Sequence, residues 1–165
     1  MHEFIEKVVD VVGDGHCGLH EVVGLRNLIV DDHQMIRYQL HKESIGEEIK
    51  RYRQLIRSDR WYKQVLWALT FSGIGPAPPD KWMIMLDLSF LNTQRYKLMV
   101  VILSIEKGRS KIFFPLCGAP LHKDRMMCMT HVNDNHFMII YLKVSCPIPP
   151  TFALWRQHCR DDTKN

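Results

Sequence analysis

The sequence predicts an α+β fold in which helices are packed on a small central β-sheet. Before residue 73, apolar residues recur at the three- and four-residue spacing of helices. A run rich in glycine and proline at 73–80 is the strongest breaker in the chain. Beyond it, strand-length apolar segments appear beside one short helical pattern. With 165 residues, the chain is expected to form a single domain, 1–165, with its own core.

The first half is expected to supply one strand and four helices. An Ile- and Val-rich segment at 4–12 predicts a short strand or extended lead-in, which the turn Gly13-Asp14-Gly15 ends. A helix is expected from Cys17 to about Ile29, because its apolar residues fall on one helical face. The other three are expected after an N-cap at Asp31-Asp32, from a capping box formed by Ser44 and Glu47, and at about Trp61 to Phe71.

The second half is expected to supply most of the sheet. The nearly continuous apolar run at 97–105 is typical of a central strand that is covered on both faces. The expected elements, in order, are a short helix at 86–95, strands at 97–105 and 111–116, a loop from Cys117 to about Thr130, and a last strand at 136–144.

Composition favours an ordinary globular domain, with 46% hydrophobic residues, 24% charged residues and a net charge of +4. An odd number of cysteines, five, and a start without an apolar leader favour a reducing compartment, cytoplasmic or nuclear. No apolar run approaches the roughly 20 residues of a membrane span, so no membrane partner is expected. The basic residues at 50–63 are interleaved with acidic ones, which favours a solvated helix flank over a nucleic-acid-binding face.

The candidate nucleophile is Cys17, within the segment Gly13-Asp14-Gly15-His16-Cys17-Gly18. A thiol placed where a glycine-rich turn enters a helix faces unpaired backbone N–H groups and the positive end of the helix dipole. Both are expected to lower its pKa. The same N–H groups can bind the oxyanion of an acyl-transfer intermediate. Taken alone, the pattern is also compatible with a small buried cysteine.

The candidate base is His136, one of nine histidines. It follows the polar turn 133–135 and begins an apolar strand, so its ring is expected to be held rigidly at the mouth of a cleft. The others lie near a terminus, among charged helical neighbours or in loops. A nucleophile and base so far apart in sequence would meet only in the folded chain.

A zinc site is the rival interpretation of Cys117, His122, Cys128 and His131. Their spacing, C-x4-H-x5-C-x2-H, fits no common zinc finger. A flexible loop over the cleft is favoured instead, and no metal or other cofactor is expected.

Several motifs, in the right order, resemble the OTU (ovarian tumour) family of cysteine peptidases. Asp14-Gly15-His16-Cys17 is similar to its Asp-Gly-x-Cys signature, in which the third residue is usually Asn. Residues 82–105 resemble its block of Trp, short helix and hydrophobic strand, and Asn135-His136-Phe137 resembles its His–aromatic motif. The similarity covers about 8–158. The details look closest to plant OTU-like domains associated with Mutator-like transposable elements, at 76–83, 113–116, 135–137 and 146–150.

This resemblance implies an OTU-like fold and a deubiquitinase mechanism. Cys17 would attack the carbonyl of the isopeptide bond after the C-terminal glycine of ubiquitin or a ubiquitin-like modifier. His136 would accept the thiol proton and later protonate the departing lysine amine. Asp14 is usually counted with the active site of the family because it shapes the loop, although a plain turn-forming Asp explains it equally well. The expected partners are ubiquitin or ubiquitin-like conjugates, and the chain is expected to be a monomer.

Residue 138 departs from the family pattern. Many OTU enzymes carry Asp or Asn two residues after the histidine to orient its ring, and Met138 cannot do so. Asp134 and Asp14 are equally favoured as the orienting residue, ahead of Asn135. Asp10, in the first strand, is a further possibility, and a weakly oriented dyad stays open.

Two other function classes stay open as well. A chain without an orienting residue could keep the fold and bind ubiquitin without cleaving it. A nucleic-acid-binding accessory of a transposase would rest only on the basic segment. Trp82, directly after the breaker, is expected to be a structural anchor that pins this junction to the sheet.

Overall fold

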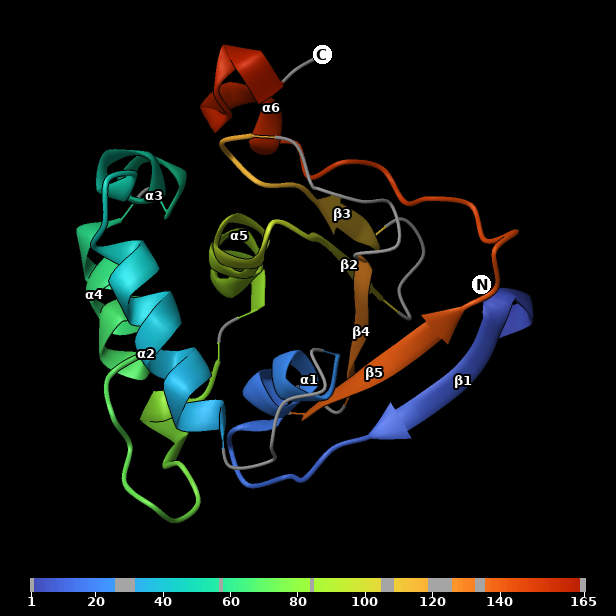
Figure 1. Ribbon diagram of the computed structural model, residues 1–165, viewed down its shortest axis with the longest axis horizontal. Helices are drawn as coiled ribbons and strands as arrows, with labels where there is room; N and C mark the ends of the chain where they lie inside the picture. The colour runs from blue at the N-terminus through green and yellow to red at the C-terminus, as the bar shows by residue number, and fades with distance from the viewer. Residues whose placement is uncertain are drawn as a thin grey trace.

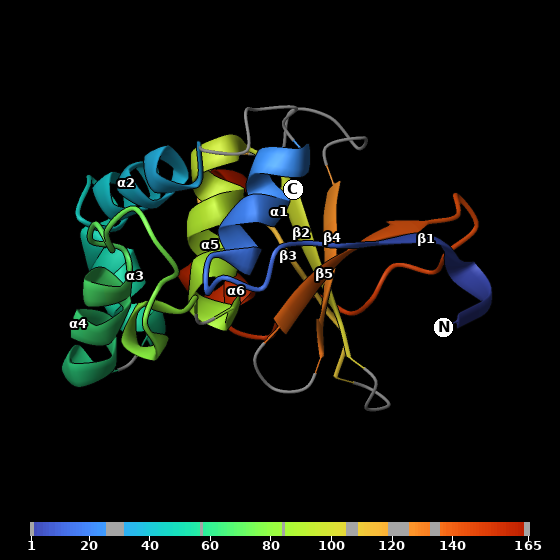
Figure 2. The same cartoon turned by 90° about the horizontal axis from the view of Figure 1, so that it is seen from below.

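The computed structural model describes residues 2–25, 32–56, 58–83, 85–104, 109–118, 126–132 and 136–163. These residues form a five-stranded sheet with helices gathered on one side of it (Figure 1 and Figure 2). The arrangement confirms the predicted α+β class. No helix in these ranges is long and apolar enough to cross a membrane.

The sheet has the strand order β1-β5-β4-β2-β3. Its strands are β1 (Ile5–Asp10), β2 (Met99–Leu103), β3 (Lys111–Phe113), β4 (Met126–Val132) and β5 (His136–Leu142). Strands β2 and β4 are parallel, and the other neighbouring strands are antiparallel. At the β1 edge, Asp10 is paired with Met138. The end of β1 therefore lies beside the start of β5.

Strand β4 corrects the sequence prediction, which placed a loop at 117–130. Residues 126–132 form an inner strand between β2 and β5. The Met-rich segment has few of the β-branched residues that mark strands, but its parallel pairing with β2 and its buried inner residues override this weak local preference.

The helices are α1 (Cys17–Leu25), α2 (His33–Ser44), α3 (Ile49–Ile56), α4 (Asp59–Ala68), α5 (Met85–Tyr96) and α6 (Trp155–His158), with single 3₁₀ turns η1 (His2–Phe4), η3 (Pro79–Lys81) and η4 (Asp161–Thr163). Helix α1 packs on β5, and α5 packs on β2 and β3. Helix α2 packs on both α1 and α5, and α3 and α4 pack on each other farther from the sheet (Figure 2).

The predicted capping box at Ser44 is wrong. Ser44 is the buried last residue of α2, and its hydroxyl donates to the carbonyl oxygen of His41 at 2.7 Å. Helix α3 begins only at Ile49. A serine hydroxyl can bond backward to a helical carbonyl as readily as it caps a new helix. The serine that does cap a helix is Ser58, whose side chain accepts a hydrogen bond from the backbone N–H of Trp61 in α4.

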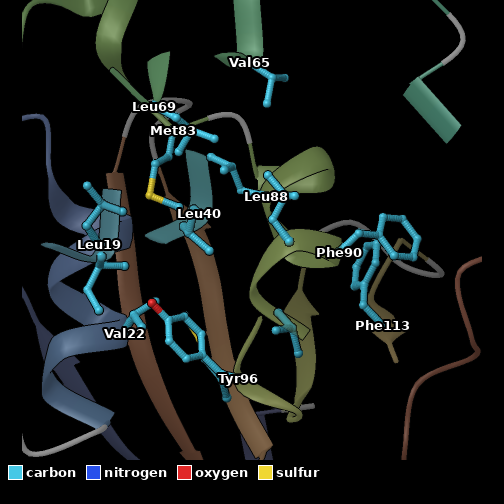
Figure 3. Packing of buried hydrophobic residues seen from close by; sticks show 14 of the residues in the cluster. Leu19, Val22, Leu40, Val65, Leu69, Met83, Leu88, Phe90, Tyr96 and Phe113 are labelled. Atoms are coloured by element: carbon cyan, nitrogen blue, oxygen red, sulfur yellow. The ribbon is translucent and has the colours of Figure 1, made fainter. Parts of the chain in front are cut away.

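The main hydrophobic core fills the space between the helices and the sheet (Figure 3). Side chains from α1, α2, α5 and β3 are almost completely buried there, among them Leu19, Val22, Leu40, Leu88 and Phe113. Each such side chain contributes about 1.5–3 kcal/mol by its burial. Cys17 belongs to the same cluster, so the core fixes the helix that carries the candidate nucleophile.

Candidate active site

Cys17 is the first residue of α1 and follows a tight turn in which Gly15 has a φ of 80°. A Cβ atom on Gly15 would lie 2.6 Å from both the Ala77 carbonyl oxygen and Trp82 Nε1. Both the conformation and the space therefore require glycine here. The backbone N–H of Ala77 donates to the Asp14 carbonyl at 2.8 Å, which holds the turn against the glycine- and proline-rich segment 73–80.

Trp82 anchors this turn. Its indole N–H donates to the Ala77 carbonyl at 2.9 Å, and the ring lies against Gly15. The side chain is only partly buried. Trp82 is thus an anchor, as expected, but for a different part of the fold. These contacts hold the turn at 13–16 that leads to Cys17, called the nucleophile turn below, and not the sheet.

The thiol of Cys17 is buried, with 7% of the residue exposed. Burial raises its pKa, while the backbone N–H groups of Phe137 and Gly18 act in the opposite direction. The expectation of a lowered pKa is therefore wrong for this conformation, because desolvation outweighs the hydrogen bonds from the backbone. The side chain is accordingly a thiol at neutral pH and needs a base for activation.

His136 is the first residue of β5, and its imidazole is bound to Asp10. Its Nε2 lies 2.6 Å from Asp10 Oδ1. The hydrogen bond from His136 lowers the pKa of Asp10, so this carboxylate is an ionised acceptor and Nε2 carries the proton. In the neutral ring the lone pair is then on Nδ1. A Cβ on Gly13 would lie 3.9 Å from this nitrogen, so this edge of the ring lies close to Gly13, which begins the turn that leads to Cys17.

The fold brings the two predicted residues to one place. The backbone N–H that faces the Cys17 thiol belongs to Phe137, the residue directly after His136. Helix α1 packs on β5, and the hydrogen bond from Phe137 places the start of the strand at the start of the helix. The three groups Cys17, His136 and Asp10 thus converge from α1, β5 and β1.

Asp10 is the residue that sequence reasoning ranked too low. It lies opposite Met138 in the β1–β5 pairing, so its carboxylate reaches the ring from the neighbouring strand. Of the two favoured candidates, Asp134 lies outside the described residues, as does the lower-ranked Asn135, and Asp14 bonds to His16 and His20 instead. The signal that could have found Asp10 is the register of the two strands, which a single sequence does not specify.

The carboxylate of Asp14 accepts hydrogen bonds from residues of the nucleophile turn and of the helix that follows it. Its Oδ1 accepts from the backbone N–H of His16 at 2.9 Å, and its Oδ2 accepts from Nε2 of His20 at 2.9 Å. Burial tends to raise the pKa of Asp14, but the hydrogen bonds from His20 and His16 outweigh it and leave the value below the ordinary one. Asp14 therefore shapes the turn, and its carboxylate oxygens bond there rather than to His136.

Within the described residues the rival zinc set is not assembled. Cys128 and His131 both lie in β4, and Cys128 is buried in a cluster on the sheet. His122 falls outside the described residues. Across the ranges that the structure describes, no three His, Cys, Asp or Glu side chains are grouped to hold a metal ion.

No family model and no curated protein matches the chain. Solved structures do match it. The viral OTU domain protease from Dera Ghazi Khan virus is 9% identical with a TM-score of 0.57, covering 86% of this chain and 83% of that chain. The Hazara virus OTU bound to ubiquitin is 14% identical with a TM-score of 0.54, covering 87% and 85%. The OTUD1 OTU domain is 14% identical with a TM-score of 0.57, covering 81% and 84%. Such similarity, at low identity but over most of both chains, shows that this protein has the fold of an OTU domain.

Proposed function

We propose that this protein is a cysteine-type deubiquitinase, a thiol hydrolase that cleaves the isopeptide bond after the C-terminal glycine of ubiquitin or a ubiquitin-like modifier. The observation that carries the proposal is the convergence of Cys17, His136 and Asp10 at the meeting point of α1, β5 and β1. Ubiquitin is the favoured modifier because one protein of the same fold, the Hazara virus OTU, is bound to it.

In the proposed reaction, His136 Nδ1 takes the proton of the Cys17 thiol as the sulfur attacks the carbonyl carbon. Asp10 holds the tautomer and stabilises the imidazolium that forms. Backbone N–H groups of the turn at 14–17, other than that of His16, which donates to Asp14, bind the oxyanion. The tetrahedral intermediate then expels the lysine amine, which receives the proton from His136. Water, deprotonated by the same ring, hydrolyses the thioester and frees both the carboxylate and the thiol.

The raised pKa of Cys17 favours deprotonation that is coupled to attack over a thiolate present at rest. A hydrogen-bonded base is then indispensable, which gives the Asp10–His136 pair its importance. All five cysteines are free thiols, which supports the further proposal of a reducing location, cytoplasmic or nuclear. The likeness to plant domains associated with Mutator-like elements stays a proposal that rests on the sequence motifs.

The test is hydrolysis of ubiquitin conjugates by the parent protein and by Cys17→Ala. We expect the variant to lose at least about 10³-fold in kcat, on the scale of other nucleophile deletions, and to keep its fold by circular dichroism. Cys146→Ala, which removes a partly exposed thiol, is the matched control and should turn over normally. Turnover retained by Cys17→Ala would rule out the cysteine-peptidase mechanism.

A ubiquitin-binding module without hydrolysis is the second candidate. It is favoured by Met138 in the usual position of the orienting residue and opposed by Asp10 on the ring. A parent protein that binds ubiquitin but is inert toward every conjugate would establish it.

A further inference from the structure

Arg37 is a buried cation that the proposed reaction does not use. It lies in α2 with 1% of its surface exposed. Its Nη1 donates to the carbonyl oxygens of Ala68, at the end of α4, and of Lys81, in η3, the latter at 3.1 Å. Removing a guanidinium from water costs several kcal/mol unless good hydrogen bonds compensate. Because its burial costs this desolvation free energy, we expect Arg37 to have a specific role among its hydrogen-bond partners.

The third partner of Arg37 is His16, the residue directly before the nucleophile. Nη2 of Arg37 lies 3.0 Å from Nδ1 of His16. A guanidinium can only donate, so Nδ1 is the acceptor and the ring proton is on Nε2. Nε2 lies 3.3 Å from the carbonyl oxygen of Gly75, to which it donates. Arg37 therefore holds His16 in one neutral tautomer and one orientation.

The backbone of His16 is held as firmly as its ring. Its N–H donates to Asp14 Oδ1 at 2.9 Å, and its carbonyl accepts from the N–H groups of Leu19 at 2.7 Å and His20 at 3.0 Å. This carbonyl belongs to the peptide unit that supplies the amide nitrogen of Cys17. The orientation of His16 thus determines where the first turn of α1 points the thiol and its N–H groups.

We infer that Arg37 is a positioning residue for Cys17, and that it acts through the tautomer and orientation of His16. The part of this inference that concerns turnover rests on the proposed function. The part that concerns the thiol does not, because the geometry of Cys17 affects any reaction of its sulfur.

The charge of Arg37 also affects the protonation of His16. Burial lowers the pKa of His16, and Arg37 and His33 lower it further, while Asp14 and the hydrogen bond to Gly75 raise it. The rings of His33 and His20 lie 4.3 Å and 6.1 Å from that of His16, measured between centroids. Without Arg37, Nδ1 becomes free to accept a proton and one cause of the lowered pKa of His16 is removed, so an imidazolium would form beside Cys17 at a higher pH than in the parent.

A double-mutant cycle with Arg37→Met and His16→Asn tests the inference. The rate at which iodoacetamide alkylates Cys17, resolved by peptide mass spectrometry, is measured from pH 5 to pH 9, together with kcat on a ubiquitin conjugate. We expect Arg37→Met to lower both rates at least about 10-fold and to add an acidic step to the alkylation profile. In the His16→Asn background the same substitution should change neither rate more than about twofold and add no step.

Equal losses in both backgrounds would overturn the inference, because Arg37 would then act only through Ala68 and Lys81. A wild-type alkylation profile for folded Arg37→Met would do the same. If Arg37→Met does not fold, Arg37→Lys replaces it in the cycle, since it keeps the buried charge but not the forked geometry. Absent turnover in the parent, with the alkylation cycle as expected, would refute the proposed function and leave the positioning role standing.

Discussion

The two ends of the proposed catalytic group are built in opposite ways. At the nucleophile end, His16 is 1% exposed and its ring and backbone are all hydrogen-bonded. At the base end, the side chain of His136 is 22% exposed and that of its partner Asp10 is 75% exposed. The turn that leads to Cys17 is thus held by a buried network, whereas the imidazole of His136 is held by one short hydrogen bond in contact with water.

Because of this difference, substitutions at the two ends should affect catalysis and stability to different extents. Exposed ion pairs are screened by water and salt, so the Asp10–His136 pair is expected to affect catalysis far more than stability. The buried network belongs to the packing of the domain, and damage there should affect both. Substitutions at the two ends therefore test the comparison separately.

The largest expected effect on stability lies at the buried end, at Glu21, one helical turn after Cys17. Glu21 is 0% exposed, neither carboxylate oxygen has a hydrogen-bond partner in the described part of the chain, and burial raises its pKa to about 9. The unfolded chain releases this proton near pH 4.5, whereas the native state keeps it up to about pH 9. The free energy of unfolding should therefore fall as the pH rises through this interval, by up to about 1.4 kcal/mol per pH unit.

Glu21→Gln should remove this slope and stabilise the protein by several kcal/mol at pH 8, with little effect near pH 4. Urea unfolding at a series of pH values measures it. Glu47→Gln, at an exposed glutamate, is the control and should leave the slope unchanged. If Glu21→Gln and the parent show parallel pH dependence, Glu21 is not neutral in the folded state.

At the exposed end, Asp10→Ala should lower kcat by about 10²-fold, the scale on which an oriented base contributes, with little change in melting temperature. Steady-state kinetics on a ubiquitin conjugate measure it. Asp59→Ala, at a side chain that is 78% exposed, serves as the control. Adding Met138→Asn to Asp10→Ala should restore part of the rate, because it places an acceptor two residues after His136, the position usual in OTU enzymes. An unchanged kcat in Asp10→Ala would mean that another group orients His136.

The smallest expected effect concerns two glycines, Gly15 in the turn before Cys17 and Gly75 in the glycine- and proline-rich segment 73–80 that contacts this turn. Gly15→Ala should lower the free energy of unfolding by at least about 2 kcal/mol, because it combines a positive φ with a close approach to backbone. Gly75→Ala should change it by less than about 0.5 kcal/mol, since no atom lies within 4 Å of the added Cβ. Chemical unfolding compares them, and equal effects would contradict the role assigned to the turn.

The sequence predicts the features that depend on local patterns, but not those that depend on contacts between distant segments. Cys17 and His136 could be singled out as candidates because a glycine-rich turn before a helix and a histidine before an apolar strand are local patterns. Asp10 depends on the pairing of β1 with β5, which joins residues far apart in the chain. Arg37 is one charged residue in a helix with several polar neighbours, and its burial arises only when α2, α4 and η3 meet around it. Strand β4 was missed because its position between two partners, not its own residue types, determines its conformation.

The most direct test of the catalytic group is a ubiquitin probe with an electrophile at its C-terminus, followed by peptide mass spectrometry. We predict one adduct per chain, on Cys17, formed about 10²-fold more slowly in Asp10→Ala and absent in Cys17→Ala. An adduct on another cysteine, or labelling of Cys17 at the parent rate without Asp10, would contradict the assignment of Cys17, His136 and Asp10 as one catalytic group.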